Sequence, residues 1–123
     1  MHIMQKQTEE NFKVAQLTQW GFAPDKDYTL GRVDAKMQNI WLEAKRGGDD
    51  IYKMLAQIIF TTKIEVAISS DGVPPYLGCF NQTQGAIIHE NDIFTVLKYP
   101  LNWMQKPSKI DDETVKIVKS LLA

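Results

Sequence analysis

The chain has 123 residues, which is the usual size of one domain and enough to bury a hydrophobic core without disulfides or structural metals. Its 44% apolar and 24% charged residues are typical of a globular protein, and it has no run of about 18 apolar residues that could cross a bilayer. The net charge of −1 argues against a strongly basic, autonomous nucleic-acid binder.

Two features of the sequence bear on its compartment. The N-terminal residues 1–6 lack a long apolar stretch and a small-residue cleavage site, so we expect no secretory signal. The single cysteine, Cys79, cannot form an internal disulfide and has no cysteine or histidine partner at zinc-binding spacing. Together they predict a cytoplasmic protein in which Cys79 is a strand residue rather than a nucleophile.

The first part of the sequence predicts a helix followed by a β-hairpin. Residues 5–20 carry a broad apolar side and are followed by Gly21, in the position of a C-terminal helix cap. β-compatible residues run from 28 to 37, the Gln-Asn pair at 38–39 suits a tight turn, and residues 40–45 form the second strand.

The rest of the sequence predicts a longer helix and then a series of short elements. Asp49 or Asp50 can cap a helix whose apolar residues recur at helical spacing as far as about Thr62. The remaining elements are strands over residues 64–69, 76–80 and 85–89, a short helix or irregular segment at 91–97, and a final amphipathic helix from about Asp111. This order, αββαβββ with terminal helices, predicts an α/β (α+β) fold with a mixed sheet flanked by helices.

A group of charged residues lies on the predicted hairpin. Glu43 and Lys45 share one face of the second strand, because alternate residues of a strand point to the same side. A two-residue loop at 38–39 places Asp34 directly opposite Glu43. Two carboxylates about 5 Å apart repel by roughly 3 kcal/mol at an effective dielectric constant of about 20, so the pair needs a cation or a proton.

This group has two interpretations. Two acidic oxygens and a nearby backbone carbonyl make a hard-oxygen site suited to Mg²⁺ or Mn²⁺, and a metal-bound water can become a nucleophile. The alternative is a solvated charged face, a common origin of such patterns on exposed hairpins. The metal site is favoured by apolar residues on the opposite face, by the Gly47-Gly48 break after Lys45, and by Gln57 on the following helix.

The stretch from Ile40 to Thr61, with Asp34 before it, resembles the PD-(D/E)XK nuclease superfamily, and looks most like nuclease modules fused to bacterial restriction DNA methyltransferases. The family pattern is an acidic residue at the end of one strand, E-x-K or D-x-K on the next, and then a helix that often carries Gln. The matching residues here are Asp34, Glu43-Ala44-Lys45 and Gln57. The resemblance implies a restriction endonuclease-like domain over residues 1–123, as the N-terminal part of a longer polypeptide.

The resemblance also implies an activity: metal-dependent hydrolysis of DNA phosphodiester bonds by a restriction-modification endonuclease with Mg²⁺ or Mn²⁺ as cofactor. Asp34 and Glu43 would hold the metal, with the Ala44 carbonyl as a third protein ligand. Lys45 would position or activate the water and stabilise negative charge that develops on the phosphate. Gln57 would orient the site or contact a phosphate, the alternative being a solvated helix residue.

Family members often add an acidic residue from the first helix, and Glu10 is the candidate here. Glu9 is the neighbouring alternative, and plain solvent exposure competes with both. Two departures from the family pattern are visible: no proline precedes Asp34, and Thr61 replaces the tyrosine that follows Gln57 by four residues in the exonuclease-type motif. The second departure argues against an exonuclease.

DNA is the expected partner, and no membrane partner is expected. The candidate phosphate-binding cluster comprises Arg32, Lys36, Lys45, Arg46 and Lys53. Because no helix-turn-helix or other specificity element is recognisable, sequence recognition is expected from methyltransferase or recognition domains of the same polypeptide, with dimerisation on DNA to cut both strands. The alternative functions are a catalytically silent nuclease-fold module that binds DNA or protein, and a small domain with a salt-bridged hairpin. His89 and Trp103 are expected to be structural.

Overall fold

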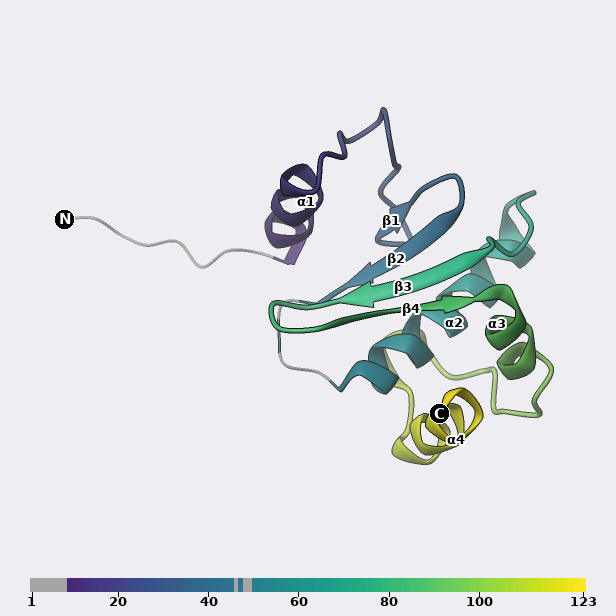
Figure 1. Ribbon diagram of the computed structural model, residues 1–123. Helices are drawn as coiled ribbons and strands as arrows, with labels where there is room; N and C mark the ends of the chain where they lie inside the picture. Colours follow the sequence, from purple (N-terminus) through teal and green to yellow (C-terminus); the bar gives the residue numbers. More distant parts are fainter. Residues whose placement is uncertain (1–8, 46, 48–49) are drawn as a thin grey trace.

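Four strands form one mixed sheet in the computed structural model, which describes residues 9–45, 47 and 50–123 (Figure 1). The elements are α1 (Glu9–Gln19), β1 (Ala35–Lys36), β2 (Ile40–Ala44), α2 (Ile51–Ile68), β3 (Tyr76–Phe80), β4 (Gly85–His89), α3 (Glu90–Leu97), the 3₁₀ helix η1 (Pro107–Lys109) and α4 (Asp112–Leu122). The expected mixed sheet flanked by helices is therefore confirmed.

The sheet has the spatial order β1-β2-β3-β4. β1 pairs with β2 and β3 pairs with β4 in antiparallel fashion, whereas β2 and β3 are parallel. Parallel neighbours need a crossover connection, and α2 supplies it. The crossover therefore packs α2 against β2 and β3, next to the hairpin.

Each face of the sheet is covered by helices, with α1 on one side and α2, α3 and α4 on the other (Figure 1). Trp41 and Leu77 belong to the larger core, which α2 fills with Met54, Ile58 and other apolar residues. Leu42 and Ala44 point the other way and pack with residues of α1. This alternation along β2 confirms the two faces expected from the sequence and places Glu43 on the α2 side.

Gly21 ends the first helix as predicted. Its φ of 93° lies in the left-handed region that glycine adopts without strain. The Gly21 N–H donates to the Thr18 carbonyl at 3.0 Å and the Phe22 N–H to the Leu17 carbonyl at 2.9 Å, which is the Schellman arrangement of a helix C-terminus. The predicted helix start at residues 5–8 lies outside the described residues.

The hairpin register is the predicted one, but its first strand is much shorter than expected. Ala35 pairs with Leu42 and Lys36 with Trp41, and the Met37 N–H closes the two-residue loop on the Ile40 carbonyl at 3.0 Å. The prediction of a strand from 28 to 37 is wrong, because residues 31–34 bend and only 35–36 pair as β1.

The physical reason for this short strand is visible at both of its ends. Thr29 and Lys36 exchange two backbone hydrogen bonds, so the chain loops back between them instead of running straight. Beyond Ala35, the Ala44 N–H donates to the Asp34 side chain at 2.9 Å. In a continuing antiparallel ladder that N–H would bond to a backbone carbonyl. The Asp34 carboxylate therefore replaces the ladder at the point where β1 ends.

The prediction of a strand over residues 64–69 is also wrong. α2 continues through this segment to Ile68, although Ile64, Val66 and Ile68 favour strands. Val66 packs against the larger core, and Glu65 on the neighbouring position pairs with Arg32 and Lys36. These tertiary contacts outweigh the local β-preference of the segment.

The other predicted elements agree with the structure. The strands at 76–80 and 85–89 are β3 and β4, and the segment at 91–97 is helical within α3. Asp50 caps α2 through its side chain, and Asp111 caps α4. Within the described part of the chain, no helix has the length and apolar character needed to cross a membrane.

Candidate active site

A cavity of about 240 Å³ opens where β1 ends beside β2 and α2. It is lined by Arg32, Asp34, Glu43, Lys45, Gln57, Thr61, Pro107 and Ser108. The four side chains predicted for catalysis therefore come together from three separate segments of the chain. η1, which packs against α2, completes the wall.

Asp34 is held at the end of the hairpin by contacts to both of its carboxylate oxygens. Its Oδ2 accepts the Ala44 N–H at 2.9 Å, and its Oδ1 lies 3.5 Å from the Nζ of Lys13. In an antiparallel pair the N–H and C=O of one residue point to the same neighbouring strand, so we expect the Ala44 carbonyl to face the Asp34 side as well.

Glu43 is buried, with 8% of its surface exposed, and it faces Asp34 in the register of the hairpin. Burial, and after it the charge of the neighbouring Asp34 carboxylate, raise the pKa of Glu43 to about 7 against the opposing effect of Lys45. The Lys45 Nζ lies 3.5 Å from Glu43 Oε1. Near neutral pH Glu43 is therefore only partly ionised.

Gln57 projects from α2 into the same cavity and is 4% exposed, so the alternative of a solvated helix residue is wrong. Its Oε1 is buried and has no hydrogen-bond partner among the described residues. Leaving a buried acceptor unpaired costs roughly 1–3 kcal/mol. An orphaned oxygen in the wall of a cavity indicates a donor supplied from the cavity, such as a water molecule or a substrate group.

These residues fit a small divalent cation. The described residues contain no cluster of three or more His, Cys, Asp or Glu side chains, so the two carboxylates would need oxygens from the backbone and from water to complete the coordination. Mg²⁺ is bound in this way, through one or two carboxylates and several retained waters. The hard oxygens of Asp34, Glu43 and the Ala44 carbonyl suit Mg²⁺ or Mn²⁺ rather than a softer metal.

No protein-family model, curated protein or solved structure matches this chain.

The first helix brings Lys13 to the site. Glu9 and Glu10, the acidic residues considered for this position, begin α1, but their side chains lie outside the described part of the chain. Lys13 is buried and is four residues before the fully buried Leu17, so it lies on the packed face of α1. We did not predict this contact. The sequence signal for it is a lysine at a position of the helix pattern where an apolar residue is expected.

Four further residues line the cavity: Arg32, which was expected in the phosphate-binding cluster, and Thr61, Pro107 and Ser108, which were not predicted. Arg32 lies in the bend before β1, and its Nη1 is 3.0 Å from Glu65 Oε2. Thr61 lies one turn after Gln57 on α2 and is buried. Ser108 belongs to η1, which is far away in the sequence and reaches the cavity only through the packing of η1 on α2. No local sequence pattern identifies such a residue.

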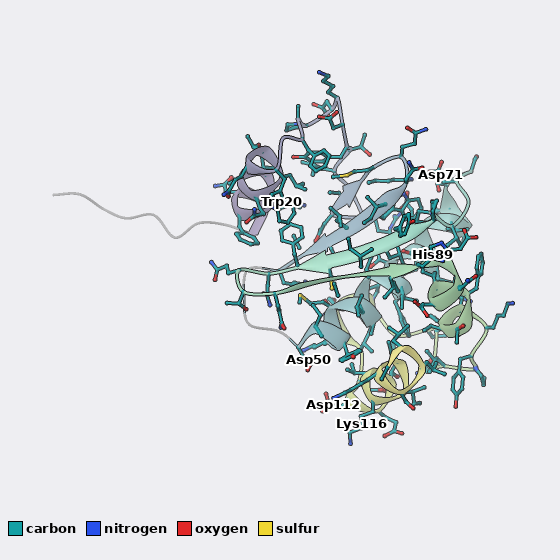
Figure 2. The ribbon with its side chains drawn as sticks, in the orientation of Figure 1. Trp20, Asp50, Asp71, His89, Asp112 and Lys116 are labelled. Carbon is teal, nitrogen blue, oxygen red and sulfur yellow. The ribbon has the colours of Figure 1, made fainter. Side chains whose placement is uncertain are left out.

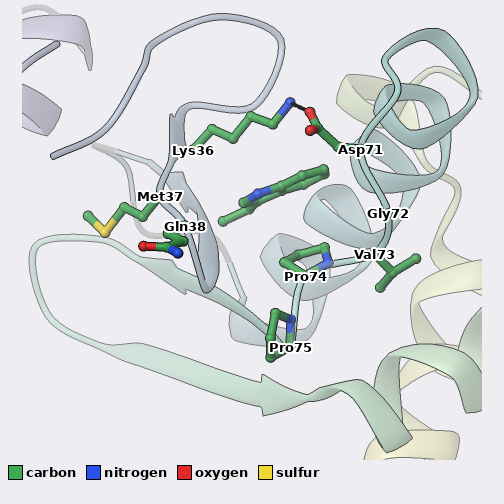
Figure 3. Close-up of a pocket in the computed structure, with 9 residues that line it drawn as sticks. Lys36, Met37, Gln38, Asp71, Gly72, Val73, Pro74 and Pro75 are labelled. Carbon is green, nitrogen blue, oxygen red and sulfur yellow. Dashed lines mark hydrogen bonds and ion pairs between the residues drawn. The ribbon is translucent and has the colours of Figure 1, made fainter. Parts of the chain in front are cut away.

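A second cavity, of about 370 Å³, contains none of the predicted catalytic residues (Figure 3). It is lined by Lys36, Met37, Gln38, Trp41, Asp71, Gly72, Val73, Pro74 and Pro75. An ion pair between Lys36 and Asp71 closes one side of it, and Lys36 also pairs with Glu65 at 3.1 Å. Lys36 is thus neutralised by two carboxylates.

His89 and Trp103 occupy structural positions. His89 ends β4 and caps α3, since its Nδ1 accepts the Asn91 N–H at 3.5 Å (Figure 2). Trp103 stacks against Phe60 with 4.5 Å between ring centroids, and its Nε1–H donates to the Tyr99 carbonyl. Neither side chain lines the cavity that holds Asp34 and Glu43.

Proposed function

We propose that this chain is a PD-(D/E)XK-type nuclease domain that hydrolyses DNA phosphodiester bonds with Mg²⁺ or Mn²⁺ as cofactor. The observation that carries this proposal is the convergence of Asp34, Glu43, Lys45 and Gln57 on one cavity. A solvated charged hairpin would leave such residues exposed, whereas Glu43 and Gln57 are buried. Burying charged and polar groups around an open cavity is costly unless the cavity receives something that satisfies them.

The arrangement of the elements supports the same proposal. The resemblance implies that the acidic residue and the E-x-K motif lie on paired strands and are followed by a helix and a further strand of the sheet. In this chain β1 and β2 form the hairpin, α2 follows, and β3 returns parallel to β2. A restriction endonuclease-like fold is therefore part of the proposal.

In the proposed reaction the protein groups have separate tasks. A bound Mg²⁺ or Mn²⁺ lowers the pKa of a coordinated water and polarises the scissile phosphate. Asp34 and Glu43 would hold this cation, and its positive charge would favour the ionised form of Glu43. Lys45 stabilises the negative charge that develops on the phosphate oxygens. The Gln57 Oε1 accepts a hydrogen bond from the attacking water and orients it.

The surface charge limits what this chain does alone on DNA. Of the expected phosphate-binding cluster, Arg32 and Lys36 are paired with Glu65 and Asp71, and Arg46 lies outside the described residues. Neutralised side chains release few counterions from DNA and so add little affinity. We therefore propose that methyltransferase or recognition domains of a longer polypeptide supply most of the binding, and that two copies meet on DNA to cut both strands.

A plasmid-nicking assay tests the proposed activity. The purified chain is incubated with supercoiled plasmid and with linear duplex at low salt, in Mg²⁺, Mn²⁺ or EDTA. Metal-dependent nicking is expected, with a loss of about 10²–10³-fold in Lys45→Ala, because a charge-stabilising group is removed. Lys116→Ala is the matched control, since this lysine is exposed on α4 away from the cavity (Figure 2).

The outcomes of this assay separate the candidate functions. Absence of cleavage together with absence of calorimetric Mn²⁺ binding would overturn the nuclease and leave a domain with a salt-bridged hairpin. Mn²⁺ binding that depends on Asp34 and Glu43, but without cleavage of any substrate, would instead favour the catalytically silent module.

A further inference from the structure

Lys13 reaches the candidate site from the opposite side of the sheet. It lies on α1, which covers the face that α2 does not (Figure 1). Its side chain is only 6% exposed, and its Nζ lies 3.5 Å from Asp34 Oδ1. Lys13 does not line the cavity, so its ammonium group stands behind Asp34 rather than in the space open to substrate.

This contact restricts how Asp34 can bind cations. A carboxylate that bridges two metal ions must offer one oxygen to each of them, at a metal separation of about 3.5–4 Å. Asp34 already directs Oδ1 to the Lys13 ammonium and Oδ2 to the Ala44 N–H. Because Lys13 is buried, its charge cannot turn away into water without breaking the packing of α1.

The charges around the cavity also argue against a second metal ion. With both carboxylates ionised, Asp34 and Glu43 are balanced by the ammonium groups of Lys13 and Lys45. One divalent ion then brings two positive charges, which a phosphodiester and a hydroxide ion neutralise. A second divalent ion would add two further positive charges, and the described residues offer no third carboxylate in the cavity.

We propose that Lys13 is a positioning residue that takes the place of a second cation beside Asp34, so that the site binds a single divalent metal ion per chain. This inference rests on the proposed metal-dependent nuclease. Lys13 acts through Asp34: it fixes the direction of that carboxylate and lowers the attraction of the site for cations.

The test measures Mn²⁺ binding to the full chain by titration calorimetry and by the electron paramagnetic resonance signal of free Mn²⁺. The wild-type chain and the exposed-lysine control Lys116→Met are expected to bind one Mn²⁺. Lys13→Met puts an apolar side chain of similar length in place of the lysine and so removes one positive charge. Its first Mn²⁺ is expected to bind at least about tenfold more tightly, because Asp34 keeps its negative charge but loses the neighbouring ammonium group. Lys13→Arg keeps the charge and is expected to bind as the wild type does.

Two results would overturn this inference while leaving the nuclease intact. One is a stoichiometry of two Mn²⁺ in the wild-type chain, which is decided without any variant that could fail to fold. The other is an unchanged Mn²⁺ affinity in folded Lys13→Met, which would make Lys13 a packing residue only. In both cases metal-dependent nicking persists. Absence of Mn²⁺ binding and of nicking in all four proteins would overturn both proposals.

Discussion

Asp34 and Glu43 face each other at the point where β1 and β2 separate, with Glu43 buried under α2 and Asp34 held by the Ala44 N–H. The pKa of Glu43 rises to about 7 because of burial first and the Asp34 charge second. Glu43 is therefore only partly ionised near neutral pH.

This pKa predicts how stability depends on pH in the absence of metal. The carboxyl of Glu43 has a pKa near 4.5 when unfolded and about 7 when folded, so the native state holds the extra proton between these values. Its stabilising effect is complete below pH 4.5 and is lost as the pH rises through 7. We expect the wild type to lose roughly 2–3 kcal/mol relative to Glu43→Gln across this range. Urea unfolding at several pH values in EDTA measures the difference, and a constant difference would contradict it.

The ion pair between Lys13 and Asp34 predicts energetic coupling between α1 and the hairpin. Lys13→Met and Asp34→Asn each remove one partner of this ion pair, and Asp34→Asn takes the Asp34 charge away from the buried Lys13 ammonium group. Removing one member of such a pair costs about 3–5 kcal/mol in a fully buried site, and we expect roughly 2–4 kcal/mol here because Asp34 is 26% exposed.

The double variant tests whether these two effects belong to one interaction. We expect Lys13→Met combined with Asp34→Asn to be more stable than the sum of the single effects predicts, by roughly 1 kcal/mol or more. Urea unfolding of the four proteins gives the coupling free energy. Effects that simply add would show that the ammonium and the carboxylate do not stabilise one another.

The residues that sequence reasoning placed correctly share a local geometric cause. The two-residue loop at 38–39 fixes which residues pair, and the period of two along β2 fixes which side chains share a face. Together these rules bring Asp34, Glu43 and Lys45 into one place without knowledge of the rest of the chain. The helix end at Gly21, the Asp50 cap as one of two candidates, and the start of the last helix near Asp111 follow from similar local rules, because helix ends have their own chemistry.

What could not be predicted depends on contacts between distant segments. Residues 64–68 remain helical because Val66 and Glu65 meet partners from other elements, against their own preference for a strand. Lys13 and Ser108 reach the site through the packing of α1 on the sheet and of η1 on α2. The burial of Glu43, which sets its pKa, likewise depends on α2 and not on the sequence around Glu43.

Cys79 is predicted to be chemically inert in the native state. It lies beside Glu43 in the parallel register of β2 and β3, and burial raises the pKa of its thiol to about 12. The thiolate is the reactive form, so little of it exists near pH 8. Iodoacetamide should label Cys79 slowly in the native chain and rapidly in urea. Complete labelling of the native chain within minutes would contradict the buried position of Cys79. The variant Lys45→Ala is a control that shows whether the loss of one charge at the site changes the labelling rate.

Gly78 is predicted to be required for the close approach of β2, β3 and β4. It pairs with Leu42, and a Cβ at this position would lie 2.7 Å from Leu42 Cδ2 and 3.3 Å from the Ala86 carbonyl oxygen. Such overpacking typically costs about 1–3 kcal/mol, so Gly78→Ala should lower the free energy of unfolding by this amount. Gly72→Ala is the matched control, because a Cβ there meets nothing within 4 Å.

A double variant tests whether the contact between Gly78 and Leu42 is the cause of this loss of stability. If the clash with Leu42 causes the loss, truncation by Leu42→Ala in the Gly78→Ala background should cost less than it does in the wild type, since the two side chains compete for one space. Because Leu42 is next to Glu43 on β2, a shift of this strand should also weaken Mn²⁺ binding in Gly78→Ala. Equal unfolding midpoints for Gly78→Ala and Gly72→Ala would show that β2 and β3 have room for the extra methyl group.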